Sequence, residues 1–190
     1  WQTTPEAQNV VRGFNESVIM PYPKDVVDVV FYLRDYDGNF VEKMKLTVDP
    51  NDYFIRHANY YPYPIYDVYG DYDPQNAVDI VILPDGYTSE EMGKFIKDCD
   101  YFKNCLFSYE PYASYTDRFN IRAVMAPSKD SGITIPAEDI WKNTAVNCAF
   151  YTFDSERYCM SYDNQSIRNL AGQVPYDQIY ILANTSKYGG

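Results

Sequence analysis

The chain has 190 residues, enough for one domain of medium size or two small ones, each with a buried core. Its formal net charge of -11 is spread over both halves and no basic tract is present, which argues against nucleic acid as a partner. No apolar run approaches the length of about 20 residues that a membrane-spanning helix needs, so we expect no transmembrane span.

The two ends of the chain have the character of cuts through a longer protein. The first residue is Trp1, and no charged and apolar regions of a signal peptide follow it. The last residues, Tyr188 to Gly190, are a turn signal rather than a tail. We therefore expect that the chain is a segment of a larger parent protein.

The first third of the chain predicts β structure. Residues 26–33 and 40–48 are rich in β-branched or alternating apolar residues, and they flank an Asp-Gly turn in residues 35–39. This arrangement predicts a β-hairpin. A run in residues 9–20 alternates less cleanly, and the three short runs together favour part of a β-sandwich.

Residues 50–75 are rich in proline and tyrosine and show no sustained period, so we interpret them as an ordered linker without regular structure. The only histidine, His57, lies in this linker, and we expect it to be solvated or to have a structural hydrogen bond. With one histidine, the chain cannot supply a two-histidine metal site.

A different pattern begins at residue 76. Residues 78–83 are nearly all apolar, which is typical of a strand buried on both faces. After the turn at residues 84–86, Thr88 and Glu91 have the spacing of a capping box and predict a helix start. Apolar residues then recur at helical spacing and predict one buried helix face: Met92, Phe95, Ile96, Cys99, Phe102 and Leu106.

Three more elements follow this helix. Residues 119–125 alternate as a strand, residues 161–171 predict a short helix, and residues 178–183 form an apolar strand that we expect inside the sheet. This order predicts an α/β domain whose sheet is at least partly parallel. The predicted fold class is α+β overall, with a partial β-sandwich and linker in residues 1–75 and an α/β domain in residues 76–190.

The four cysteines leave two arrangements open. Cys99 and Cys105 point to different faces of the predicted helix, so they cannot pair while the helix holds. Cys148 and Cys159 flank a segment that a disulfide could close, and free buried thiols are the alternative. The sequence contains neither a Gly-x-Ser-x-Gly elbow nor a His-Glu-x-x-His motif, so the residues alone indicate a scaffold without an active site.

Six blocks of sequence in the second half carry a resemblance to a known family. They are residues 78–88, 106–112, 117–121, 131–136, 143–145 and 175–180. In these blocks the chain resembles the start of the IgA-peptidase-like zinc metallopeptidase family of gut-associated bacteria. Residues 1–75 are similar to the later part of the N-terminal β-sandwich domain of that family, with residues 1–4 and 49–53 as the clearest matches.

The resemblance implies a zinc endopeptidase that hydrolyses protein or peptide substrates with zinc-activated water. In the family, a helix with the His-Glu-x-x-His motif follows a Gly-rich turn, and this chain stops before that helix. The resemblance therefore carries over no catalytic or metal-binding residue, and zinc is expected in the full-length parent rather than in this segment. We expect Lys187, Tyr188, Gly189 and Gly190 to flank the cleft, the paired glycines permitting a sharp turn.

The resemblance also implies export, so we expect the parent protein in the periplasm, at the outer membrane or outside the cell. One alternative function remains open. The parent could be a non-catalytic surface protein, or a module that binds glycans or proteins, built on the same scaffold. The residues that follow Gly190 separate the two hypotheses, because only the peptidase requires the His-Glu-x-x-His motif.

Overall fold

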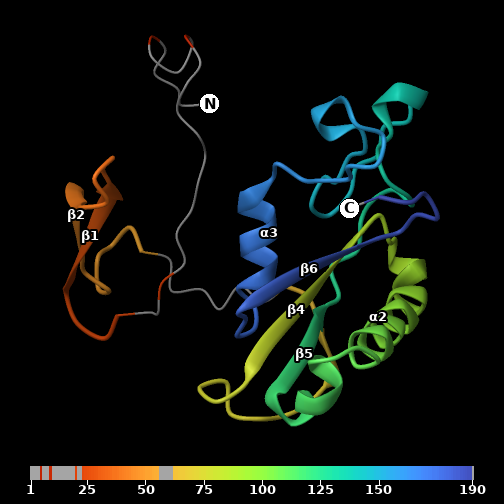
Figure 1. The fold of residues 1–190 in the computed structure, drawn as a ribbon, viewed down its shortest axis with the longest axis horizontal. Coiled ribbons are helices and arrows are strands. Elements are labelled where there is room, and N and C mark those ends of the chain that lie inside the picture. The colour runs from red at the N-terminus through yellow and green to blue at the C-terminus, as the bar shows by residue number, and fades with distance from the viewer. Residues whose placement is uncertain (1–4, 6–8, 10–19, 21–22, 56–61, 190) are drawn as a thin grey trace. The chain divides into compact units, whose positions relative to one another are not determined.

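The structure is a computed structural model that describes residues 5, 9, 20, 23–55 and 62–189 (Figure 1). The described residues belong mainly to two separate units, a small one that contains residues 23–55 and a larger one that contains residues 62–189. The fold class is α+β, as predicted, with two sheets and few helices. His57, Gly190 and the sequence block at residues 1–4 lie outside the described residues.

The small unit contains the predicted β-hairpin. Strand β1 (Val27–Arg34) pairs with strand β2 (Phe40–Val48) in antiparallel register. In the turn, the Asp35 carboxylate accepts the backbone N–H groups of Asp37 at 3.0 Å and Asn39 at 2.8 Å. The hydrogen bond from the Asn39 backbone is the main cause that lowers the pKa of Asp35 below its ordinary value.

The two faces of this hairpin differ in polarity. Val29 lies opposite Leu46 on the apolar face, whereas Asp28 on the other face pairs with Lys45 at 2.8 Å. On the apolar face the side chains of Met44 and Leu46 each keep 52% of their surface exposed. Within the small unit, the described residues therefore do not cover the apolar face.

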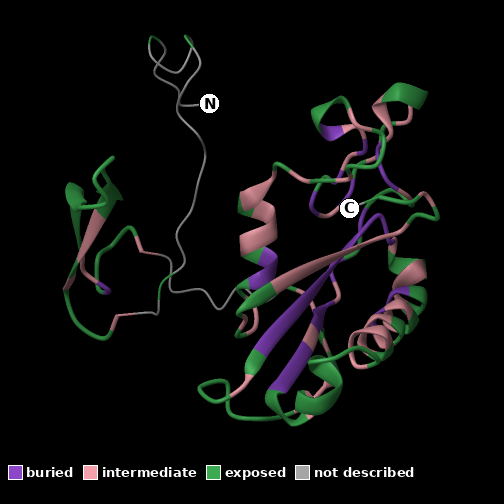
Figure 2. Ribbon diagram, in the orientation of Figure 1, coloured by how far each residue is buried: buried purple, intermediate pink, exposed green. Residues whose placement is uncertain are grey.

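The larger unit is built on a sheet of four strands in the order β3-β5-β4-β6. The strands are β3 (Ile65–Tyr69), β4 (Val78–Asp85), β5 (Phe119–Val124) and β6 (Gln178–Ala183). Strand β4 is parallel to both β5 and β6, and β3 is antiparallel to β5. After its first residue, every residue of β4 is buried (Figure 2), as the continuous apolar run predicts.

Strand β3 lies in the segment that the sequence analysis interpreted as an irregular linker, and that interpretation is wrong for residues 65–69. The strand is recognisable only through its partner. The Arg122 guanidinium of β5 pairs with the Asp67 carboxylate at 2.9 Å, and Val68 is buried in the core. The prolines on either side of this strand give no signal for β structure. The strand is stabilised by pairing with a strand more than fifty residues later, which the local sequence does not indicate.

Strand β6 is at the edge of the described sheet, so the prediction that it lies inside the sheet is wrong. After the exposed Gln178, its residues are half-buried rather than buried. Ile179 and Ile181 pack on one side of the sheet, and Tyr180 and Leu182 pack on the other. A strand with both faces covered but one open edge has the same apolar sequence as an internal strand, which explains the error.

Two helices cover opposite faces of the sheet (Figure 1). Helix α2 (Met92–Leu106) buries Phe95 and Cys99 against Ile80 and Ile82 of β4. Helix α3 (Asn164–Ala171) buries Leu170 against the opposite face of the same strand. The other predicted apolar residues of α2, which are Met92, Ile96, Phe102 and Leu106, are half-buried.

Four short 3-10 helices complete the larger unit: Ser89–Glu91, Tyr112–Arg118, Pro136–Glu138 and Thr152–Asp154. The first of them leads directly into α2, so the helix start that the sequence predicts after Thr88 is present. Among the residues that the structure describes, no helix is both long and apolar enough to cross a bilayer.

Candidate functional site

The carboxyl end of β4 is organised by a buried carboxylate. Asp85 is 0% exposed, and its two oxygens accept the Thr144 hydroxyl at 3.0 Å and the backbone N–H groups of Val146 at 2.8 Å and Cys148 at 2.9 Å. These bonds satisfy the buried charge and hold residues 144–148 over the end of the strand. The sequence analysis treated Asp85 only as a turn residue.

The next residue, Gly86, requires a glycine. Its φ is 74°, and a Cβ at this position would collide with the carbonyl of Gly132. The Gly86 carbonyl accepts the Gly132 N–H at 2.9 Å and the Asn184 side-chain amide at 2.9 Å. This turn therefore ties the end of β4 to the residue that follows β6.

A polar network joins that same position to the start of α2. The Glu91 carboxylate accepts the Thr88 N–H at 2.9 Å, the Ser131 hydroxyl at 2.8 Å and the Asn184 amide at 3.2 Å. The Thr88 bond is the main cause that lowers the pKa of Glu91. The Lys94 ammonium donates to the Asn184 side-chain oxygen at 3.0 Å, so one asparagine connects both helix residues to β6.

Beyond β6 the chain continues into Lys187, Tyr188 and Gly189, which we call the rim segment. The Lys187 ammonium lies 2.8 Å from a carboxylate oxygen of Glu156 and 3.4 Å from one of Glu138. The hydrogen bond with Glu156 is the main cause that raises the pKa of Lys187. The rim segment is thus held by carboxylates from two other loops.

Gly189 packs closely against the loop of residues 149–158. A Cβ at this position would collide with the Phe150 ring and with the Arg157 carbonyl. Gly189 does not have a positive φ, and close approach explains the glycine at this position. The sharp turn expected at the paired glycines stays a prediction, because Gly190 lies outside the described residues.

The structure brings Cys148 and Cys159 close to each other, one residue before each member of a backbone bridge between Ala149 and Met160. The neighbouring thiol of the other cysteine is the first cause that raises the pKa of Cys148 and lowers that of Cys159. All four cysteines are free thiols here, with Cys99 buried on α2 and Cys105 half-buried, so the predicted disulfide stays a prediction.

The chain was also compared with known families and proteins. Residues 67–190 match the family described as IgA Peptidase M64, and residues 1–45 match the family described as Peptidase M64 N-terminus. The first match alone covers more than half of the chain. The chain belongs to the IgA peptidase M64 family. This assignment confirms the resemblance found in the six sequence blocks. A comparison with curated proteins gave no match.

The M64 resemblance implies a zinc ion, which needs several His, Cys, Asp or Glu ligands close together. Over residues 23–55 and 62–189, no three or more His, Cys, Asp or Glu side chains are arranged to hold a metal ion. This part of the M64 chain therefore does not fit a zinc site. The carboxylates described above have other partners: Asp85 is bonded to a loop, and Glu91 to the start of a helix.

Two cavities adjoin the loop of residues 149–158 in this M64 chain. One, of about 540 Å³, is lined by Cys148, Cys159, Ile181, Lys187 and Gly189, among others, and it borders the open edge of β6. The structure thus places the predicted cysteines and two of the predicted cleft-flanking residues around one cavity.

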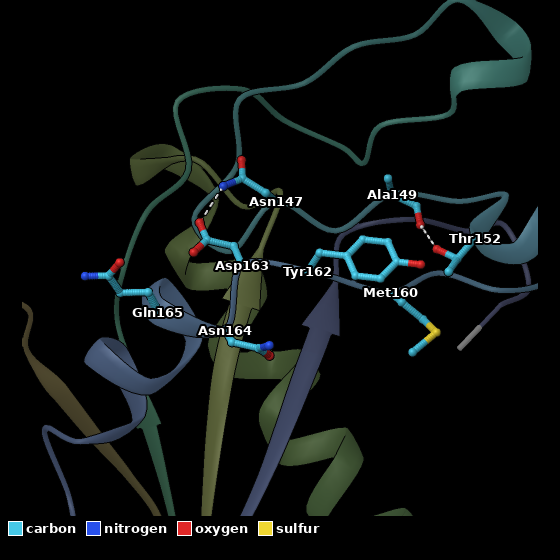
Figure 3. Close-up of a pocket in the computed structure, with 8 residues that line it drawn as sticks. All are labelled: Asn147, Ala149, Thr152, Met160, Tyr162, Asp163, Asn164 and Gln165. Atoms are coloured by element: carbon cyan, nitrogen blue, oxygen red, sulfur yellow. Dashed lines mark hydrogen bonds between the residues drawn. The ribbon is translucent and has the colours of Figure 1, made fainter. Parts of the chain in front are cut away.

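The other cavity, of about 410 Å³, is shown in Figure 3. There the Asn147 amide donates to the Asp163 carboxylate at 2.9 Å, and Tyr162 lines the same cavity. Asp163 also accepts the Ser166 N–H at the start of α3, and this bond is the main cause that lowers its pKa. A carboxylate with a lowered pKa is a poor general acid.

Proposed function

We propose that the chain is part of an exported, zinc-dependent endopeptidase that hydrolyses protein substrates, whose zinc ligands lie outside the described residues. The observation that carries this proposal is the match of residues 67–190 to a peptidase family. Zinc in such an enzyme polarises a bound water and the substrate carbonyl. The described residues contain no cluster of three or more side chains that could hold it, so their proposed role is to position the cleft.

The geometry supports this positioning role. In open sheets with parallel strands, ligands bind beyond the carboxyl ends of the strands. Here the carboxyl ends of β4 and β6 are joined by Gly86 and Asn184, and the rim segment follows directly. We therefore propose that Lys187, Tyr188 and Gly189, together with Gly190, flank the substrate cleft.

For the small unit, we propose that the β1–β2 hairpin is part of a β-sandwich. Residues 1–45 match the N-terminal family of the M64 peptidases. The half-exposed apolar face with Met44 and Leu46 is the kind of surface that a second sheet covers in a sandwich. A site of action in the periplasm, at the outer membrane or outside the cell is the corresponding proposal for the parent protein, and cell fractionation tests it.

The decisive experiment is to sequence the codons that follow Gly190 and to express the protein through that region. We expect a His-Glu-x-x-His motif, one zinc per chain by metal analysis, and cleavage of a denatured protein substrate. Absence of the motif would favour the alternative, a surface protein that binds without catalysis.

The 190-residue chain serves as the control. It should hold no stoichiometric zinc and cleave no protein, because the described residues contain no ligand set and the chain has a single histidine. One tightly bound zinc per chain in this control would contradict the proposal that the zinc ligands lie elsewhere.

A further inference from the structure

Cys148 and Cys159 are held near each other by the backbone around them. The residues that follow them, Ala149 and Met160, exchange both backbone hydrogen bonds of an antiparallel bridge, at 3.0 and 3.1 Å. Positions one residue before each member of such a bridge lie on the same face of the two segments. Cys148 and Cys159 are accordingly diagonal neighbours at the base of the loop of residues 149–158, and both line the same cavity.

The two cysteines differ in how they are held. Cys148 is 4% exposed, and its backbone N–H is bonded to the buried carboxylate of Asp85. Cys159 is half-buried, and both cysteines line the cavity of about 540 Å³. A small disulfide reagent can therefore reach Cys159 from the cavity, while Cys148 stays fixed beneath it. The lowered pKa of Cys159 favours it as the attacking thiolate.

The loop that the cysteines bound is strained. Three of its residues that are not glycine have a left-handed backbone: Tyr151 with φ 64°, Phe153 with φ 57° and Asp154 with φ 56°. Such residues cost free energy and persist only where the surroundings hold them. A covalent link between the ends of the loop reduces the number of open conformations that compete with the strained one.

The same loop holds the rim segment. Glu156 pairs with Lys187, the Arg157 guanidinium lies 5.9 Å from the Tyr188 ring centre, and Phe150 lies against Gly189. All three contacts come from between the two cysteines. Opening of the loop would therefore remove these three contacts from the rim segment, while the contact of Lys187 with Glu138 would remain.

We propose that Cys148 and Cys159 form a redox site whose oxidation to a disulfide locks the loop of residues 149–158 onto the rim segment. The oxidant is of the disulfide class, such as oxidised glutathione. The Cys159 thiolate attacks one sulfur of the reagent and forms a mixed disulfide, and one reagent thiolate leaves. Cys148 then gives its proton to that thiolate and attacks the Cys159 sulfur, and the second reagent thiolate leaves and takes up the proton that Cys159 lost on ionisation. Two protein thiols lose two electrons, and one reagent disulfide becomes two thiols.

Alkylation and peptide mapping test the chemistry. The 190-residue chain is treated with oxidised glutathione, denatured and alkylated. We expect two alkylated cysteines, Cys99 and Cys105, and one crosslinked peptide that joins Cys148 to Cys159. The C105S variant should give the same crosslink, and C159S should give none. Four alkylated cysteines, or a crosslink that includes Cys99 or Cys105, would overturn the proposal.

Limited trypsin digestion tests the lock. Cleavage after Arg157 and Lys187 requires local opening of the loop or of the rim segment. We expect both cleavages to be at least about tenfold slower in the oxidised chain than in the reduced one. In the control variants C159S and C148A/C159A, the same oxidant should leave both cleavage rates unchanged. If one of these variants does not fold, the other is sufficient as the control.

Equal cleavage rates in a wild-type chain that mapping shows to be crosslinked would refute the lock. Neither measurement depends on peptidase activity or zinc. A negative result here therefore leaves the proposed function untouched, and failure of the proposed function leaves this test intact.

Discussion

The two sheets of this chain differ in how far their strands are buried. Strand β4 in the larger unit is buried from its second residue to its last, whereas every residue of β2 except the last is exposed. Both strands pair with neighbours and have β-forming sequences, so pairing is not what separates them. The larger unit has helices on both faces of its sheet, and the described part of the small unit has none. Strand pairing without a covering layer thus leaves apolar surface in water.

The strongest test of this comparison is the F95A substitution in α2. Phe95 is 0% exposed and packs on β4 and β5. Loss of a fully buried phenyl group should lower the free energy of unfolding by about 3–5 kcal/mol. Urea unfolding monitored by circular dichroism measures it, and a loss below about 1 kcal/mol would show that α2 does not cover the sheet as described.

The next largest effect is expected for D85A, which removes the acceptor at the end of β4. The Thr144 hydroxyl and two buried backbone N–H groups would lose their partner, at a cost of about 2–4 kcal/mol in unfolding free energy. D85N keeps one acceptor oxygen and should cost less. Equal stability of D85A and the wild type would mean that water replaces the carboxylate without penalty.

In the small unit, L46A gives the contrasting measurement. Because 52% of the Leu46 surface is exposed, the substitution should cost less than about 1 kcal/mol in the 190-residue chain. In a longer protein that carries the complete sandwich, the same substitution should cost about 2–5 kcal/mol, because the leucine would then be buried. The same small cost in both proteins would argue against a covering sheet.

The smallest effect concerns the ionisation of Glu156, which pairs with Lys187 of the rim segment. The bond to Lys187 lowers the pKa of Glu156 below its ordinary 4.5. The folded pKa is thus lower than the unfolded one, so the contact stabilises the fold above pH 4.5 and is lost as the pH falls through the folded value. An NMR titration of the Glu156 carboxyl should show this shift, and K187M should return the pKa toward 4.5. An unchanged value in K187M would assign the shift to other groups.

The sequence predicts the parts of this fold that depend on local pattern. β4, β5, α2 and the hairpin all follow from the period and turn chemistry of their own residues. β3 and the edge position of β6 do not, because they depend on which strand lies beside them. A linear sequence contains no direct signal for that neighbour.

The residues of the candidate site likewise fall into those that the sequence predicts and those that it does not. The sequence singled out Cys148, Cys159 and Lys187, and the structure places all three around one cavity. It did not single out Asp85, Asn184 or Glu156. Each of these contacts residues far along the chain, and the only local signal is that Asp85 is the last residue of a buried strand.

The parallel pairing of β4 with β6 also has a consequence for how the protein folds. Asp79 at the start of β4 bonds through its N–H to the carboxylate of Asp177, which is 98 residues later. During synthesis, β4 leaves the ribosome long before this partner does, and closing so long a loop slows folding. Until then the most apolar strand of the chain has an open edge, where strands from other nascent chains can pair. The larger unit therefore depends on protection of this edge until residue 183 has emerged, and chains that end earlier should aggregate.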